Sequence, residues 1–295
     1  MIPTPERLQL THAAIQFVCE LEGARALHIK GPALHTELLQ LEDGQPVPRS
    51  STDADVLIEP RLARRVMQSL MKQGWRRVAS FETGSPFGHA ACVWHDKLGY
   101  ADIHRSFPGI GLRPNDAFDR FWHDRTAIQL GHRVCYVPSL EHQRLILLLH
   151  AARSGDPGVA DVEAAWRRPD DEVRSRTRQV AREFDAELPL AAAIGELEQY
   201  RDDRHYELWK QFSSGDHVVR SAEWRARLKA ARGPVDAAKL VVRSVLVNTD
   251  RLAMDLGRRP TPTEVWKAWL RRMHRAVDEN VTHHDTPHPE QEDPR

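Results

Sequence analysis

Two aspartates, Asp53 and Asp55, stand two residues apart in the segment 52–58, which begins polar and ends apolar. Such a segment is typical of a β-strand, in which residues i and i+2 point to the same face. Carboxylates held side by side repel each other unless a cation lies between them. A third acid, Asp102, occupies a second strand-like segment, 99–103. If the two strands are neighbours, the three carboxylates converge.

Three converging carboxylates favour Mg²⁺ or Mn²⁺, which are hard cations that prefer oxygen ligands. Two such ions, about 3.5–4 Å apart, stabilise the attacking and the leaving oxygen of a displacement at phosphorus. We therefore predict that Asp53, Asp55 and Asp102 hold two ions and that Asp102 helps to deprotonate the nucleophile. The alternative is that they are solvated charges, because a lone Asp-x-Asp pair occurs often by chance.

A phosphate-binding turn is predicted upstream, where the apolar run 26–29 ends at Lys30-Gly31 before a short helical segment at 33–41. A glycine at such a turn lets the backbone approach a phosphate, and a helix N-terminus adds positive potential. The Lys30 ammonium can bind phosphate oxygens as a point charge. The alternative is a surface lysine at the end of a strand.

Histidines and arginines near the acids are candidates for supporting roles. His104 shares a strand face with Asp102 and is either a hydrogen-bond donor beside the metal ligands, a general base, or a packed histidine. Arg105 and Arg49 are candidate phosphate or substrate contacts. His150 and Arg153 lie on a predicted helix that can face the cleft and contact the acceptor, although His150 also fits a hydrogen-bonded core position, and Asp161 can anchor either residue.

The elements that must position these side chains change in type near Pro138. Before it, helices are predicted at 5–22 and 60–73 and strands at 26–29, 52–58, 75–78, 90–95, 99–103, 126–130 and 134–137. After it, only helices are predicted, at 139–152, 159–168, 172–187 and onward to about 278. The pattern predicts an α+β domain over 1–138, a helical domain over 139–280 and a disordered tail over 281–295.

The composition limits the function classes. Lys plus Arg (42) balance Asp plus Glu (42), so no basic field draws in nucleic acid in general. Three cysteines do not make a disulfide framework, and no apolar run is long enough for a membrane span. We therefore expect a cytoplasmic protein without a membrane or general nucleic-acid partner.

A family resemblance follows from the order of these motifs. The chain presents in turn Ile29-Lys30-Gly31-Pro32-Ala33-Leu34, Arg49, Asp53-Ala54-Asp55-Val56-Leu57-Ile58 and Asp102-Ile103-His104-Arg105. It resembles the nucleotidyltransferase superfamily with the DNA polymerase β-like palm. More closely, it resembles the bacterial uncharacterised nucleotidyltransferase family, of the kind found beside peptide-modifying gene clusters. A helix from Ser139 to Arg153, followed by Asp161, also fits, so the resemblance covers about 27–165. The chain departs from the family at Thr52, where glycine is usual, and at Pro32.

The resemblance implies a palm with a mixed sheet and flanking helices, followed by a helical domain. It implies an enzyme that uses Mg²⁺ or Mn²⁺ and an NTP, with the nucleotide held at Lys30, Gly31, Arg49 and Thr52. An NMP or phosphoryl group would pass to a hydroxyl acceptor on a peptide, a protein or a small molecule. The alternative function is a non-catalytic palm that recognises a peptide partner, but such a module has no reason to gather three acids.

Overall fold

The computed structural model describes residues 2–39, 51–83, 88–154, 158–213, 233, 240, 247–256, 258 and 260–271. The chain divides into two compact units, Met1–Asp216 and His217–Arg295. All the candidate site residues that the structure describes lie in the first unit. The predicted tail, 281–295, lies outside the described residues.

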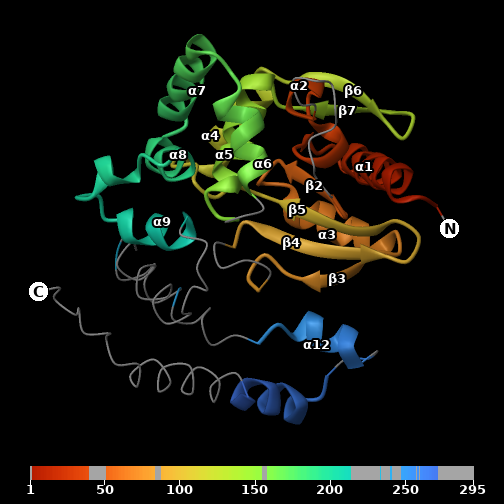
Figure 1. The fold of residues 1–295 in the computed structure, drawn as a ribbon. Coiled ribbons are helices and arrows are strands. Elements are labelled where there is room, and N and C mark those ends of the chain that lie inside the picture. Colours follow the sequence, from red (N-terminus) through yellow and green to blue (C-terminus); the bar gives the residue numbers. More distant parts are fainter. Residues whose placement is uncertain are drawn as a thin grey trace, which may run out of the picture. The chain divides into compact units, whose positions relative to one another are not determined.

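A five-stranded mixed sheet forms the centre of the first unit (Figure 1). Its strand order is β1 (Ala26–His28), β2 (Asp53–Ile58), β5 (Gly99–His104), β4 (Ala90–His95) and β3 (Arg76–Ala79). The central pair β2 and β5 is parallel, and every other pair is antiparallel. All five predicted strands of this sheet are confirmed, with ends shifted by no more than a residue or two.

One face of the sheet packs against α1 (Thr4–Leu21) and α3 (Ala63–Lys72). Alternation along β2 explains this face, because Ala54, Val56 and Ile58 point to it while Asp53 and Asp55 do not. β5 contributes Ala101 and Ile103 to the same core. The acids therefore occupy the opposite face of the two central strands.

The opposite side of the unit is built around α5 (Leu140–Ala151), which starts at Ser139, whose side chain accepts a hydrogen bond from the His142 amide. Its run Leu145–Leu149 is fully buried, as expected for five consecutive apolar residues that cover every side of this part of the helix. It shares a core with α4 (Pro114–His123) through Phe118 and Phe121. The sequence prediction missed α4, although Pro114 at the first helical position and the spacing of its buried residues are helix signals.

One predicted element, the helix that follows the first strand, differs from the structure. The helix expected over 33–41 is a 3₁₀ turn, η1 (Gly31–Ala33), followed by the single turn α2 (Thr36–Leu39). Leu34 is extended between them, and the His35 amide donates to Gln143 Oε1 at 2.7 Å. This bond to a distant helix outweighs the local helical pattern.

A separate hairpin, β6 (Thr126–Leu130) and β7 (Arg133–Val137), follows α4. Its turn is Gly131-His132, as predicted, and both residues have positive φ, as the tight hairpin turn requires.

The described elements after residue 138 are helical, as predicted. They are α6 (Val159–Val162), the π-helix η3 (Glu163–Arg167), α7 (Asp171–Glu183), α8 (Glu187–Ile194), the 3₁₀ helix η4 (Leu197–Tyr200), α9 (Tyr206–Ser213) and α12 (Thr249–Leu256). α5 to α9 belong to the same compact unit as the sheet, and the division into domains at residue 138 stays a prediction. Within the described residues, none of the helices has the length and apolarity that a membrane crossing needs.

Candidate active site on β2 and β5

The strands that carry the acids are neighbours. β2 and β5 run in parallel, and Asp55 lies directly opposite Asp102 in their register. Residues opposite each other in a sheet present their side chains on the same face. The predicted adjacency of these two strands is therefore confirmed, and it places two carboxylates side by side.

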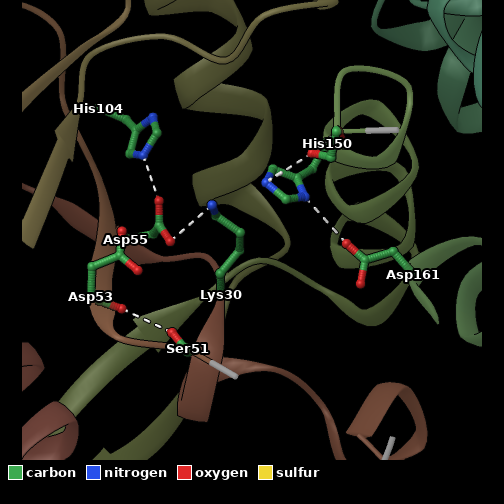
Figure 2. Close-up of polar contacts among 8 residues, drawn as sticks. Lys30, Ser51, Asp53, Asp55, His104, His150 and Asp161 are labelled. Carbon is green, nitrogen blue, oxygen red and sulfur yellow. Dashed lines mark hydrogen bonds and ion pairs between the residues drawn. The ribbon is translucent and has the colours of Figure 1, made fainter. Parts of the chain in front are cut away.

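Asp55 is the buried centre of the site, with a side chain only 3% exposed. Lys30 Nζ lies 2.9 Å from its Oδ2 atom, and His104 Nε2 donates to its Oδ1 atom at 2.8 Å (Figure 2). Burial alone would raise the pKa of Asp55, but the charge of Lys30 and the bond from His104 hold this pKa well below its usual range. Asp55 is therefore ionised although its side chain is buried from solvent.

The flanking acids are shifted in the opposite direction. Burial is the largest cause that raises the pKa of Asp53 and of Asp102, and the negative charge of Asp55 raises both further. Asp102 also accepts a hydrogen bond from the thiol of Cys92, its neighbour on β4. Such mutual repulsion is the electrostatic condition that a bound cation relieves.

A group with metal-ligand geometry is formed by Asp55, Asp102 and His104, whose ligand atoms all lie within 4.8 Å of one another. His104 Nδ1 is buried and has no hydrogen-bond partner among the described residues. The structure does not bring Asp53 into this tight group, although Figure 2 shows its carboxylate beside that of Asp55. The role of Asp53 as a metal ligand stays a prediction. His104, expected as a donor beside the ligands, a general base or a packed histidine, is bonded to Asp55.

The Lys30-Gly31 turn approaches the acids from β1. Gly31 has a φ of +61°, and a Cβ atom there would lie 3.0 Å from Ser51 Oγ. The Ser51 hydroxyl in turn donates to the Asp53 carbonyl at 3.0 Å, so the side chain that lies against Gly31 is held by the start of β2. Thr52 is exposed beside them. Arg49 lies outside the described residues.

His104 is surrounded by residues that the sequence analysis did not select. The centre of the His89 ring lies 5.4 Å from that of the His104 ring. The Phe107 ring stacks on His104 with the two ring centres 6.2 Å apart. Burial lowers the pKa of His89 to about 2, helped by the charges of His104, Arg153 and Lys30, so His89 is neutral. The sequence signal that could have pointed to His89 is its place just before the strand that starts at Ala90, because Ala90 pairs with His104.

Arg105 supports the neighbouring segment. Its Nε donates to the Gly88 carbonyl at 2.9 Å, and its guanidinium lies 4.6 Å from the centre of the Phe81 ring. The structure thus gives Arg105 a role in holding the chain near residue 88, and a phosphate contact by Arg105 stays a prediction.

The predicted helical contributions, His150 and Arg153, come from the end of α5. His150 Nδ1 lies 3.3 Å from Asp161 Oδ2, so Asp161 anchors His150. Arg153 Nε donates to the Leu149 carbonyl, and its guanidinium lies 5.4 Å from the centre of the Phe107 ring. Burial lowers the pKa of Arg153 to about 10, against the charge of Asp55. The charge of Asp55 therefore acts on Arg153, whereas the charges that act on His150 are those of Asp161, Lys30 and Arg153.

No curated protein matches this chain. Among solved structures, it is similar to the lincosamide antibiotic adenylyltransferase LnuA with lincomycin bound, at 18% sequence identity and a TM-score of 0.35. That match covers 52% of this chain and 92% of the other chain.

A family model described as uncharacterised nucleotidyltransferase matches residues 7–200, about two thirds of the chain. The match spans α1, both sheets and the helices through η4, and so extends beyond the 27–165 over which the motifs were recognised. It contains every candidate site residue. The chain therefore belongs to the uncharacterised nucleotidyltransferase family, and its activity is that of a nucleotidyltransferase.

Proposed function

We propose that this nucleotidyltransferase moves an NMP group from an NTP to a hydroxyl acceptor, with divalent cations held at Asp55 and Asp102. The observation that supports this most strongly is the register of β2 and β5, which sets these two carboxylates opposite each other. No packing requirement explains two buried or half-buried like charges at adjacent positions of a sheet. Their shared task is to hold positive charge.

The residues present fit Mg²⁺ or Mn²⁺. Asp55 and Asp102 offer carboxylate oxygens, the ligands that these ions prefer, and His104 adds a nitrogen within the same 4.8 Å group. Asp53 offers a further carboxylate beside that of Asp55 (Figure 2). When bound, the ions would neutralise the triphosphate and stabilise the charge that develops at phosphorus. The number of ions, two, is part of the proposal.

Lys30 has a double task in this proposal. Its ammonium pairs with Asp55 at 2.9 Å, which keeps the carboxylate ionised. A triphosphate at the Lys30-Gly31 turn would offer the ammonium a second anionic partner, and Lys30 is 18% exposed, so it can reach one. Gly31 and Thr52 border the same turn, where a backbone free of bulky side chains allows close approach to phosphate.

The acceptor is proposed as a hydroxyl on a peptide or a protein, with small molecules as the second choice. The support is the neutral overall charge, which does not attract a polynucleotide. The same residues can serve attack at the γ-phosphorus, which would phosphorylate the acceptor. The distinction rests on which phosphorus faces the nucleophile.

The test incubates the full chain with each NTP, Mg²⁺ or Mn²⁺, and extract from the source organism, and measures the intact mass of every modified species. Asp55→Asn is the test variant, and Asp96→Asn is the matched control because Asp96 is an exposed acid outside the site. A metal-dependent gain of one NMP that Asp55→Asn lacks and Asp96→Asn keeps would support the proposal.

Two other outcomes change the account. A gain of one phosphate would assign attack at the γ-phosphorus on the same site. If no species gains mass, and NTP with metal does not change the melting temperature of the protein, the catalytic proposal is wrong and the non-catalytic peptide-binding alternative takes its place.

A further inference from the structure

A histidine–carboxylate pair lies at the edge of the site, on elements other than the two strands that carry the acids. His150 belongs to the last turn of α5, and Asp161 belongs to α6 (Val159–Val162). His150 Nδ1 lies 3.3 Å from Asp161 Oδ2. The Asp161 side chain is only 3% exposed, whereas that of His150 is 32% exposed. The carboxylate is thus fixed inside the protein, and the imidazole is within reach of a ligand.

The pair fixes where the imidazole proton lies. An ionised carboxylate can only accept a hydrogen bond, so the nitrogen that faces Asp161, Nδ1, must carry the proton of the neutral ring. Nε2 then carries no proton and has a lone pair that can accept one. The Ser154 hydroxyl lies 3.5 Å from Nε2, but it donates to the His150 carbonyl at the shorter distance of 2.9 Å. Its single proton is therefore used by that carbonyl, and Nε2 stays able to accept a proton from elsewhere.

The position of the ring suits an acceptor that approaches the nucleotide. Figure 2 shows the Lys30 ammonium between the Asp55 carboxylate and the His150 ring. The charged groups that act on His150 are Asp161 from α6, Lys30 from the turn after β1, and Arg153 from its own helix. Burial is the largest cause that lowers the pKa of His150, Lys30 and Arg153 lower it further, and Asp161 opposes them, so the ring is neutral at pH 7.

We propose that His150, oriented by Asp161, takes the proton from the acceptor hydroxyl in the nucleotidyl transfer. This inference rests on the proposed function and deepens it. The acceptor O–H proton moves to Nε2, and the freed oxygen forms a bond to the α-phosphorus. The bond from that phosphorus to the bridging oxygen breaks, and pyrophosphate leaves with the electron pair. The imidazolium then returns its proton to solvent.

The other candidates for this task are less well placed. The Nε2 proton of His104 is bound to Asp55, and the His104 side chain is 6% exposed, so an acceptor cannot reach it easily. Asp102, which the sequence analysis favoured as the base, belongs to the group that would hold the metal. A carboxylate that binds a cation is a weaker proton acceptor than a free imidazole lone pair.

The test measures pyrophosphate release from ATP by the full chain with Mg²⁺, using water as the acceptor, between pH 5.5 and 9. His150→Gln and Asp161→Asn are compared with His123→Gln, whose target is an exposed histidine at the end of α4. His150→Ala is also measured with and without added imidazole. Asp55→Asn reports separately on the proposed function.

The expected result is a loss of about 10²-fold or more in kcat for His150→Gln, with KM for ATP changed less than about threefold. In His150→Gln, the fall in rate on the acid side of the pH profile disappears. In Asp161→Asn, this fall occurs at a different pH. Added imidazole partly restores the rate of His150→Ala. His123→Gln behaves as wild type. If His150→Gln keeps a rate within about threefold of wild type and the same pH profile while Asp55→Asn is inactive, the inference is wrong and the proposed function stands.

A second measurement does not depend on turnover. In ¹⁵N NMR spectra of the histidine side chains, assigned with His150→Gln, we expect the His150 proton on Nδ1 at pH 7.5 and a change of tautomer balance in Asp161→Asn. A proton resident on Nε2 in the wild-type protein contradicts the inference, whether or not water serves as an acceptor. If Asp55→Asn retains full activity, the proposed function fails instead, whatever His150 does.

Discussion

At the scale of single residues, the site depends on an asymmetry among its carboxylates. Asp55 is held ionised by Lys30 and His104, whereas burial and the charge of Asp55 raise the pKa of Asp53 and Asp102. Only Asp55 has its two oxygens fixed by an ammonium and an imidazole, at 2.9 and 2.8 Å. Asp55 should therefore matter more to activity than Asp53, which the sequence alone treats as its equal.

We predict that Asp55→Asn lowers Mg²⁺-dependent pyrophosphate release by about 10²-fold or more, because one fixed charge that stabilises a transition state contributes about 3–4 kcal/mol. Asp53→Asn should lower it less, since Asp53 lies outside the 4.8 Å group. Steady-state rates with saturating ATP compare the two variants, and thermal melting shows whether each variant is folded. Equal losses in both variants would contradict this ranking.

Sequence reasoning reached the acids but not their supporting contacts. Asp53, Asp55 and Asp102 could be selected because period-two spacing on a strand is a local property. The pairing of Lys30 with Asp55, and of His89 with His104, depends on which strands become neighbours, and nothing within either segment encodes that. The buried pair His12 and His28, with Nδ1 atoms 2.7 Å apart, was missed for the same reason.

At the scale of elements, the turn after β1 and the helix α5 position the site. Gly31 is favoured at the turn because its φ is +61°, and because a Cβ atom there would lie 3.0 Å from Ser51 Oγ, which would have to shift. The sequence predicted this turn, the strands and α5, whose apolar run and Ser139 cap are local signals. It did not predict the break at Leu34, because the bond from His35 to Gln143 joins residues that are far apart in the chain.

Gly31→Ala is expected to cost about 1–2 kcal/mol of stability, the usual penalty for a side chain in left-handed backbone. Gly23→Ala is the matched control, because Gly23 has a φ of +63° but no atom within 4 Å of the place that an alanine methyl group would take. Both variants should lose stability in urea unfolding, and Gly31→Ala should lose more, because only at Gly31 would a neighbouring side chain, Ser51, have to shift. Only Gly31→Ala should also weaken binding of ATP with Mg²⁺ in calorimetry, and equal affinities in the two variants would contradict the role of this turn.

Leu147→Ala on α5 should lower the free energy of unfolding by about 2–5 kcal/mol, since its side chain is fully buried in the core. Leu10→Ala on α1 is the control, with a side chain 37% exposed, and should cost less than about 1 kcal/mol. Urea unfolding with an unchanged slope measures both. A small effect at Leu147 would show that α5 is not the centre of this core.

At the scale of the whole molecule, buried neutral histidines make stability depend on pH. Burial lowers the pKa of His12 to about 4, against the charge of Asp55, and it lowers the pKa of His28 well below its usual value, helped by His12. The unfolded chain takes up protons at these histidines below about pH 6.5, whereas the folded chain does not. The contribution of the neutral histidines to the free energy of unfolding is therefore complete above about pH 6.5 and is lost as the pH falls toward 4.

For His12 this loss amounts to about 1 kcal/mol between pH 7.5 and 5.5, from the difference between its folded and unfolded pKa values. Urea unfolding at the two pH values should show a smaller difference in His12→Gln than in wild type. His123→Gln, at an exposed position, should keep the wild-type difference. An unchanged pH dependence in His12→Gln would mean that the buried pair does not control acid stability.

In the proposed function, Asp55 and Asp102 hold the divalent cation of a bound nucleotide. The most direct measurement is the binding of Mn²⁺, followed by electron paramagnetic resonance, in the presence of an α,β-methylene ATP analogue that cannot transfer its NMP. We predict saturable Mn²⁺ binding by the wild-type protein and by Asp96→Asn, and a loss of at least about tenfold in affinity in both Asp55→Asn and Asp102→Asn. Mn²⁺ affinity that is the same in all four proteins would contradict the claim.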